Sequence, residues 1–158
     1  MEKERPMKSA VSVGLTIGLW FLVLFVPPAA AKEPRCERIK GKFAAVIIQP
    51  CSDGELCTSG TLTGDVNGAY DFTVTAFLGG PPLVPFIGHS VIQNSREVLL
   101  TADVGFTNVA SGDLRGLVVI DTPESLTHLT TSGNVNFASG TVAGSYEGRR
   151  CPRSYESD

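Results

Sequence analysis

The chain is poor in the residues on which most enzymes and nucleic-acid-binding proteins depend. It has two histidines and one tryptophan among 158 residues, and its 13 basic residues are outnumbered by 16 acidic ones. Binding to nucleic acid requires clustered Lys and Arg side chains that neutralise phosphates. The composition therefore predicts no nucleic-acid partner.

Several common catalytic motifs are also missing. The chain contains no G-x-S-x-G, no H-E-x-x-H and no phosphate-binding P-loop motif, so the usual hydrolase and nucleotide chemistries have no matching residues. Cys51 and Cys57 are separated by five residues without paired histidines nearby, which is poor spacing for zinc. We therefore expect no metal and no cofactor.

Long apolar runs are absent except near the start, where residues 10–26 are uninterrupted by charge. Lys3, Arg5 and Lys8 precede this run, and the small-residue stretch 29–31 follows Pro27-Pro28. A basic start, an apolar segment and an A-x-A site are the three parts of a secretory signal peptide. The alternative is an uncleaved anchor, since the run nearly reaches membrane-spanning length.

Cleavage after Ala31 divides the chain into a signal peptide, residues 1–31, and one domain, residues 32–158. That domain has ten basic and fourteen acidic residues, a net charge of about −4, and its 127 residues suffice for a single core. We expect a secreted or periplasmic protein without stable membrane insertion after cleavage.

All four cysteines lie in this domain, and an even number in an exported chain predicts two disulfides. Cys51 and Cys57 flank a Ser-Asp-Gly turn, so a local bridge between them closes easily. The remaining pair, Cys36 and Cys151, then joins the two ends of the domain. On the chain-entropy model the long bridge stabilises by about 5 kcal/mol and the short one by about 2 kcal/mol.

No helical pattern follows residue 32, and turn residues recur about every ten positions, which is typical of an all-β protein. Alternating or continuous apolar runs predict eight strands, at residues 43–48, 58–65, 69–78, 87–93, 97–107, 114–121, 126–137 and 141–147. Eight antiparallel strands form either a closed barrel or a two-sheet sandwich. Closure removes unpaired edges, and six glycines within strands suit a coiled barrel wall, so the barrel is favoured.

The alternation also predicts which side chains face the interior. In the strand at 97–107 we expect the apolar residues inside, and in the strand at 126–137 we expect His128 outside. The aromatic residues expected to line the interior, and any ligand site there, are Tyr70, Phe72, Phe106, Phe137 and Tyr146. Charged residues expected on the outer wall are Glu97, Asp103, Arg115 and Asp121. Glycines at 116, 133 and 144 are expected to leave space inside.

Short glycine-containing motifs run through most of the domain. They read Gly-Thr-Leu-Thr-Gly-Asp at 60–65, Asp-Val-Gly-Phe at 103–106, Ser-Gly-Asp-Leu at 111–114, Ser-Gly-Asn-Val at 132–135 and Gly-Ser-Tyr-Glu-Gly at 144–148. Over residues 58–151 this succession resembles the allene oxide cyclase and dirigent-like proteins. The resemblance implies an eight-stranded antiparallel barrel.

Members of that family cyclise a reactive fatty-acid epoxide, guide the coupling of phenoxy radicals, or have undefined roles. Residues 118–125 stand where relatives often have Gly-Thr-Gly-x-Phe, and no catalytic set matches residue by residue. The resemblance therefore leaves any enzymatic role open, because one fold hosts many functions.

One further segment, residues 78–87, is apolar for a loop and contains three prolines. It is interpreted as a lid over one barrel end or as a contact patch involving Leu83, Phe86 and His89, the last of which could line a barrel mouth.

Three hypotheses for function follow. The first is a non-enzymatic barrel that binds a small apolar molecule inside or a partner through this loop. The second is a cyclase-like or dirigent-like enzyme that shapes a reactive intermediate in an apolar cavity. The third is a structural protein with a filled barrel. An acidic or tyrosine group inside the cavity distinguishes the second from the first; ligand identity and oligomeric state stay open.

Overall fold

The structure, a computed structural model, describes residues 35–153, so the predicted signal peptide and its cleavage site lie outside the described residues. The described residues form strands and no helix, and therefore no helix that could cross a membrane. The strands in chain order are β1 (Glu37–Ile48), β2 (Leu56–Gly64), β3 (Gly68–Phe77), β4 (Leu83–Gln93), β5 (Val98–Asn108), β6 (Asp113–Asp121), β7 (Ser125–Asn136) and β8 (Thr141–Pro152).

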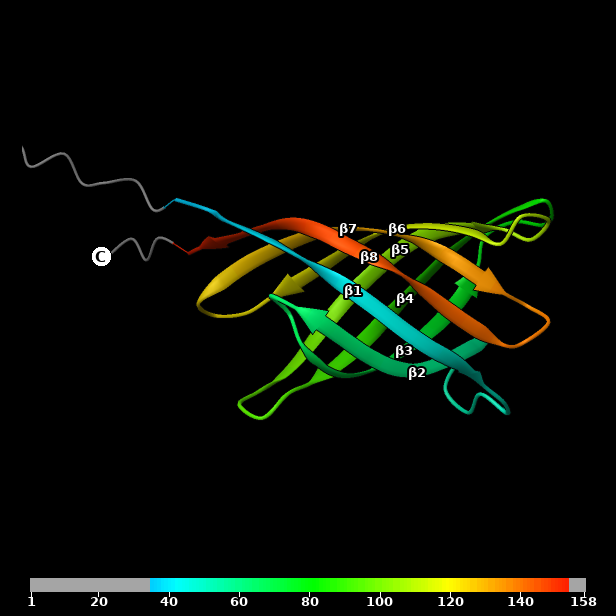
Figure 1. Ribbon diagram of the computed structural model, residues 1–158, viewed down its shortest axis with the longest axis horizontal. Coiled ribbons are helices and arrows are strands. Elements are labelled where there is room, and N and C mark those ends of the chain that lie inside the picture. The colour runs from blue at the N-terminus through cyan, green and yellow to red at the C-terminus, as the bar shows by residue number, and fades with distance from the viewer. Residues whose placement is uncertain (1–34, 154–158) are drawn as a thin grey trace, which may run out of the picture. The chain divides into compact units, whose positions relative to one another are not determined.

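The eight strands close into a barrel in which every strand pairs antiparallel with its neighbours in sequence (Figure 1). The closing contact joins β1 to β8, from Glu37 opposite Arg150 to Val46 opposite Thr141. Closure leaves no unpaired sheet edge, which removes the usual route to edge-to-edge aggregation. The predicted all-β barrel is confirmed, and the two-sheet alternative is set aside.

Both predicted disulfides are present. Cys36 and Cys151 are joined across the ends of β1 and β8, with 4.1 Å between their Cα atoms. Cys51 and Cys57 bridge the connection between β1 and β2, with 5.2 Å between Cα atoms. Two disulfides are typical of a protein that folds in an oxidising compartment.

The segment at residues 78–87 differs from its prediction as a loop. β4 begins at Leu83, so only the connection at 78–82 is irregular. Pro85 lies within β4, opposite Phe106 of β5. Proline is tolerated there because Pro85 lies just outside the β3–β4 ladder, whose last pair is Phe77 with Phe86. The Pro85 carbonyl still accepts a hydrogen bond from the Leu78 N–H at 2.9 Å.

The core inside the barrel consists of apolar side chains from β1, from β3 to β8 and from the β2–β3 connection, with Leu62 of β2 packed against them. In β7, alternate residues face inward and His128 is exposed on the outer face, as the alternation predicts. The buried cluster consists of Ile39, Phe43, Ala45, Val66, Tyr70, Ile92, Leu99, Ile120, Leu129, Val135, Val142 and Tyr146. Its members alternate with outward-facing residues along each strand.

Two glycines that were expected to leave space are instead covered by a ring. A Cβ atom on Gly144 would lie 2.5 Å from the Phe43 ring, and one on Gly133 would lie 3.0 Å from it. Gly144 pairs with both Phe43 and Gly133 in the ladders. The small residues on β7 and β8 therefore make room for Phe43 rather than for a ligand.

β5 is oriented the other way round from its prediction. Leu99, Thr101 and Asp103 are buried inside the barrel, whereas the apolar residues expected inside are exposed on the outer face. Those outer residues are Val98, Leu100, Ala102, Val104 and Phe106. The interior placement of Phe106 and the exterior placement of Asp103 were therefore both wrong.

Candidate functional site

A cavity of about 370 Å³ lies inside the barrel. This volume falls within the range of small-molecule sites, roughly 300–1,000 Å³. Its lining from β6, β7 and β8 is mainly apolar, with Leu114, Val118, Leu129, Val135 and Val142. Phe72 and Phe86 form another part of the lining, where their rings meet edge to face with centroids 5.7 Å apart. The barrel is therefore not completely filled by its own side chains.

Four polar groups of the cavity come from adjacent strands, and Thr131 adds a hydroxyl from β7. Thr58 lies on β2, Tyr70 on β3, Ser90 on β4 and Asp103 on β5, and all four contribute to the lining. Ladder pairing places these strands side by side, so these four polar groups gather on one wall. An apolar enclosure with a few convergent polar groups is the usual form of a small-molecule site.

Asp103 is the centre of this polar wall, and its residue exposure is 5%. The Ser90 hydroxyl donates to Asp103 Oδ2 at 2.6 Å, and the Thr101 hydroxyl donates to Oδ1 at 2.9 Å. Thr101 Oγ1 in turn accepts the Ser90 backbone N–H at 2.8 Å. The carboxyl group is thus fixed in position by two neighbouring hydroxyls on β4 and β5.

Burial raises the pKa of Asp103 above its ordinary value, because the charged form loses its hydration. The hydrogen bonds from Ser90 and Thr101 oppose this rise, and so does the charge of His89 on the outer face of β4. A protonated carboxyl has one O–H donor. Where Ser90 and Thr101 keep donating to the protonated carboxyl, its O–H is free to donate to an acceptor in the cavity.

Tyr70 supplies a second polar group to the same wall. Burial raises its pKa to about 12, the negative charge of Asp103 adds to the rise, and a hydrogen bond with Thr58 lowers it. The hydroxyl therefore stays protonated throughout the neutral pH range. Its electrostatic interaction with Asp103 places both groups in one polar environment.

Thr107, also on β5, lines the cavity with an unsatisfied group. Its hydroxyl oxygen is buried and has no hydrogen-bond partner among residues 35–153. Buried polar atoms are nearly always paired in folded proteins. A hydroxyl left unpaired at a cavity wall is a natural contact for a polar group of a bound molecule.

The aromatic residues predicted for the interior divide into three groups. Tyr70 and Phe72 line the cavity from β3, whereas Phe137, just after β7, touches the lining but is 48% exposed. Tyr146 faces inward as well, but its hydroxyl is bound to the connection between β2 and β3, accepting from the Val66 N–H at 2.9 Å and donating to the Val66 carbonyl at 2.5 Å. Phe106 lies on the outer face.

The three residues predicted for loop contacts do not form one patch. Leu83 and His89 are exposed on the outer face of β4, whereas Phe86 is buried and faces the cavity. His89 is therefore not at a barrel mouth. Among the predicted outer charges, Glu97, Arg115 and Asp121 are exposed, and Asp121 forms an ion pair with Arg153.

The interior polar groups Thr58, Ser90, Thr101 and Thr107 were not singled out from the sequence, and Asp103 was placed on the wrong face. The turn before β5 carried a usable signal. Asn94 Oδ1 accepts the N–H groups of Arg96 and Glu97, at 2.8 and 2.9 Å, which makes a tight turn with Gln93 opposite Val98. Opposed residues share a face, so an outward Gln93 implies an outward Val98.

A scan against models of protein families, a search of curated proteins and a search of solved structures each found no match for this chain. The cavity and its polar wall are therefore interpreted from their own chemistry.

Proposed function

We propose that the protein is exported and binds a small, mainly apolar molecule with one hydrogen-bond acceptor inside the barrel. The observation that carries this proposal is the buried carboxyl of Asp103 at the wall of a cavity otherwise lined by apolar side chains. The apolar walls would supply affinity through burial of ligand surface. Asp103, Tyr70 and the unpaired Thr107 hydroxyl would orient the polar end.

Two probes of matched shape test the role of the acceptor. 2-Acetylnaphthalene carries a carbonyl oxygen, and 2-isopropylnaphthalene has a similar outline without an acceptor. One satisfied hydrogen bond contributes about 1 kcal/mol, so we expect the ketone to bind about five- to tenfold more tightly by isothermal titration calorimetry. Binding should show a negative heat-capacity change, which is the mark of apolar burial.

Two variants locate the binding in the cavity. Asp103→Leu should reduce the ratio of the ketone affinity to the hydrocarbon affinity to about one, while the hydrocarbon still binds. Val118→Phe replaces a valine of the cavity lining with a larger side chain and should weaken the binding of both probes. The matched control is Val46→Phe, which enlarges an exposed residue on the outer face of β1. Equal affinities in wild type and Val118→Phe would exclude the interior as the site.

A second candidate function is proton-assisted rearrangement of a reactive ligand, and the inward Asp103 is the observation that favours it. With an epoxide bound, the Asp103 O–H would protonate the epoxide oxygen while the carbon–oxygen bond breaks, leaving a carboxylate. The cation would then lose a proton from carbon to Asp103, which restores the acid and gives an isomeric product. Turnover of an apolar epoxide that is lost in Asp103→Leu would support this second function over binding alone.

A further inference from the structure

The outer faces of β4, β5 and β6 carry an exposed apolar surface. On β5 it is formed by the five outward residues between Val98 and Phe106, with Leu100 exposed by 67% and Val104 by 47%. Leu117 on β6 pairs with Val104, and Ile87 on β4 pairs with the same residue from the other side. Contiguous apolar patches of this kind usually mark a contact with another molecule.

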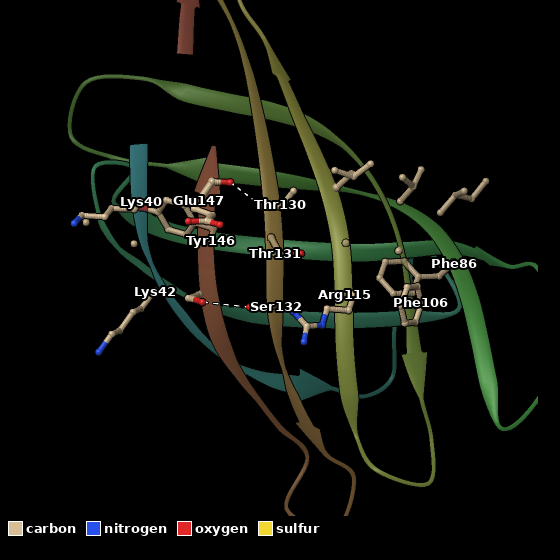
Figure 2. Close-up of a pocket in the computed structure, with 18 of the residues that line it drawn as sticks. Lys40, Lys42, Phe86, Phe106, Arg115, Thr130, Thr131, Ser132, Tyr146 and Glu147 are labelled. Atoms are coloured by element: carbon tan, nitrogen blue, oxygen red, sulfur yellow. Dashed lines mark hydrogen bonds between the residues drawn. The ribbon is translucent and has the colours of Figure 1, made fainter. Parts of the chain in front are cut away.

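This surface is hollow at one end. A groove of about 1290 Å³ crosses the outer wall, with Lys40, Thr130 and Glu147 among its polar lining on β1, β7 and β8 (Figure 2). At its other side it reaches this surface, where Val104, Phe106, Leu117 and Ile87 line it. Gly105 and Gly116 lie opposite each other on β5 and β6 and line the groove with backbone. A Cβ on Gly105 would lie 2.6 Å from the ring of Phe86, so the wall lies directly on that ring.

The opposite end of the same surface projects into solvent. Val98 and Leu100 are the more exposed end of the β5 row, at 57% and 67%, compared with 47% and 38% for Val104 and Phe106. Ala102, the smallest side chain, stands midway between the projecting end and the hollow end. Along the outer face of β5, two larger apolar side chains therefore lie on each side of Ala102, so the row is symmetric in size about that residue.

The geometry points to a second copy of this chain as the occupant of this surface. We propose a two-fold dimer whose axis passes beside Ala102 at right angles to β5. In this arrangement Val98 and Leu100 of each copy enter the hollow formed by Val104, Phe106 and Leu117 of the other. The interface is isologous, so both hollows are filled at once. The small side chain at the axis permits the two sheets to approach face to face at about 10 Å.

Charge supports the same orientation. Arg115 lies opposite Phe106 at the hollow end and forms no ion pair with any residue in the described part of the chain. Figure 2 shows its side chain between β6 and β7, beside Ser132. Asp121 follows Ile120, which pairs with Thr101, so it lies at the projecting end of β6. The two-fold rotation brings Arg115 of one copy towards Asp121 of the other, where Asp121 also pairs with Arg153.

Cysteine crosslinking tests the position of the axis. All four native cysteines are in disulfides, so a new thiol is the only reactive one. Ala102→Cys places two thiols beside each other across the axis, and mild oxidation of the exported protein should give a covalent dimer in most molecules. Ala143→Cys, on the outer face of β8 and also exposed, is the matched control and should remain monomeric. Equal crosslinking of the two variants would overturn the proposal.

Sedimentation velocity tests the apolar contact without a crosslink. The wild type should show a reversible change from monomer to dimer as the concentration rises from about 1 μM to about 1 mM, the range of weak to moderate affinity. Leu100→Glu should weaken dimerisation at least tenfold, whereas Val46→Glu, at an exposed valine outside the surface, should not. A monomer at every concentration, or a trimer, would contradict the two-fold dimer. Ligand binding in the interior is measured separately and does not depend on this result.

Discussion

β5 and β7 lie on either side of β6, and both alternate along the chain between two kinds of residue. In β7 the apolar face points into the barrel, whereas in β5 the apolar face points outward. In β7 the buried residues include Leu129 and Val135, and the outer face carries His128. In β5 the buried residues include Thr101 and Asp103, and the outer face is apolar. The alternation fixes which residues share a face, but it does not decide which face is inside.

The difference assigns distinct roles to the two strands. β7 contributes to the core in the ordinary way, through apolar burial. β5 contributes polar groups to the cavity and apolar groups to the outside. Both features of β5 cost stability in an isolated barrel, since a buried carboxyl loses hydration and an exposed leucine gains nothing from burial. An inside-out strand is therefore evidence for function on both of its faces.

The largest expected effect comes from placing a carboxylate on the apolar face of each strand. Leu129→Asp should destabilise the fold by about 4 kcal/mol or more, because a buried charge is left without a partner. Leu100→Asp should change the free energy of unfolding by no more than about 0.5 kcal/mol. Urea unfolding at low protein concentration, where self-association is excluded, measures both. Similar losses in the two variants would mean that β5 is not inside-out.

How far the sequence predicts the fold follows from the same contrast. Strand number, closure and disulfide pairing depend on turn residues, alternation and cysteine spacing, which are local features. The face of β5 depends on its register with β4, where Ile92 opposes Leu99 and Gln93 opposes Val98. A rule that apolar residues lie inside therefore places Phe106 on the wrong face. The turn at Asn94 indicates the correct face, because it pairs Val98 with the outward Gln93.

The candidate site was less accessible to sequence reasoning than the fold. Ser90 and Asp103 are 13 residues apart in sequence, with a turn between them, and only strand pairing brings their side chains within 2.6 Å. Serine and threonine are common in strands, so their presence alone indicates nothing about a cavity. The hollow of the barrel depends on packing details such as Phe43 covering Gly144, which no periodicity reveals.

The next effect concerns the pH dependence of the protein's stability that arises from Asp103 on β5. Its folded-state pKa is raised, so its contribution to stability is present at low pH and is lost as the pH rises through that pKa. Asp103→Asn stays neutral at every pH. We therefore expect the stability of the variant relative to wild type to increase as the pH rises from 4 to 8, measured by urea unfolding across that range.

The matched control is Asp71→Asn, at an exposed carboxyl on the outer face of β3. Its stability difference from wild type should stay nearly constant over the same range. A contrary result would be a fall in the stability of Asp103→Asn relative to wild type as the pH rises. The carboxylate would then be better stabilised in the barrel than in water, and its role as a proton donor would be refuted.

A smaller effect is expected from the hydroxyl that holds Asp103. Ser90→Ala removes a 2.6 Å hydrogen bond inside the barrel, and we expect a loss of about 1 kcal/mol in thermal unfolding followed by circular dichroism. Ser145→Ala removes an exposed contact with Ser132 at 3.4 Å and should have almost no effect. Losses of equal size would show that the inner polar wall has no special contribution.

The smallest effect tests whether the outer face of β4 influences the carboxyl behind it. The charge of His89 lowers the pKa of Asp103, so His89→Asn should raise that pKa further. The change in pKa should be small, because His89 is exposed and its field is screened by water and salt. Carbon-13 NMR titration of the Asp103 carboxyl measures the change, with His128→Asn on β7 as the control. Since screening strengthens with ionic strength, the effect of His89→Asn should shrink between about 10 mM and 1 M salt. A fall in the pKa of Asp103 would mean that loss of the imidazole altered the barrel wall itself rather than removed a nearby positive charge.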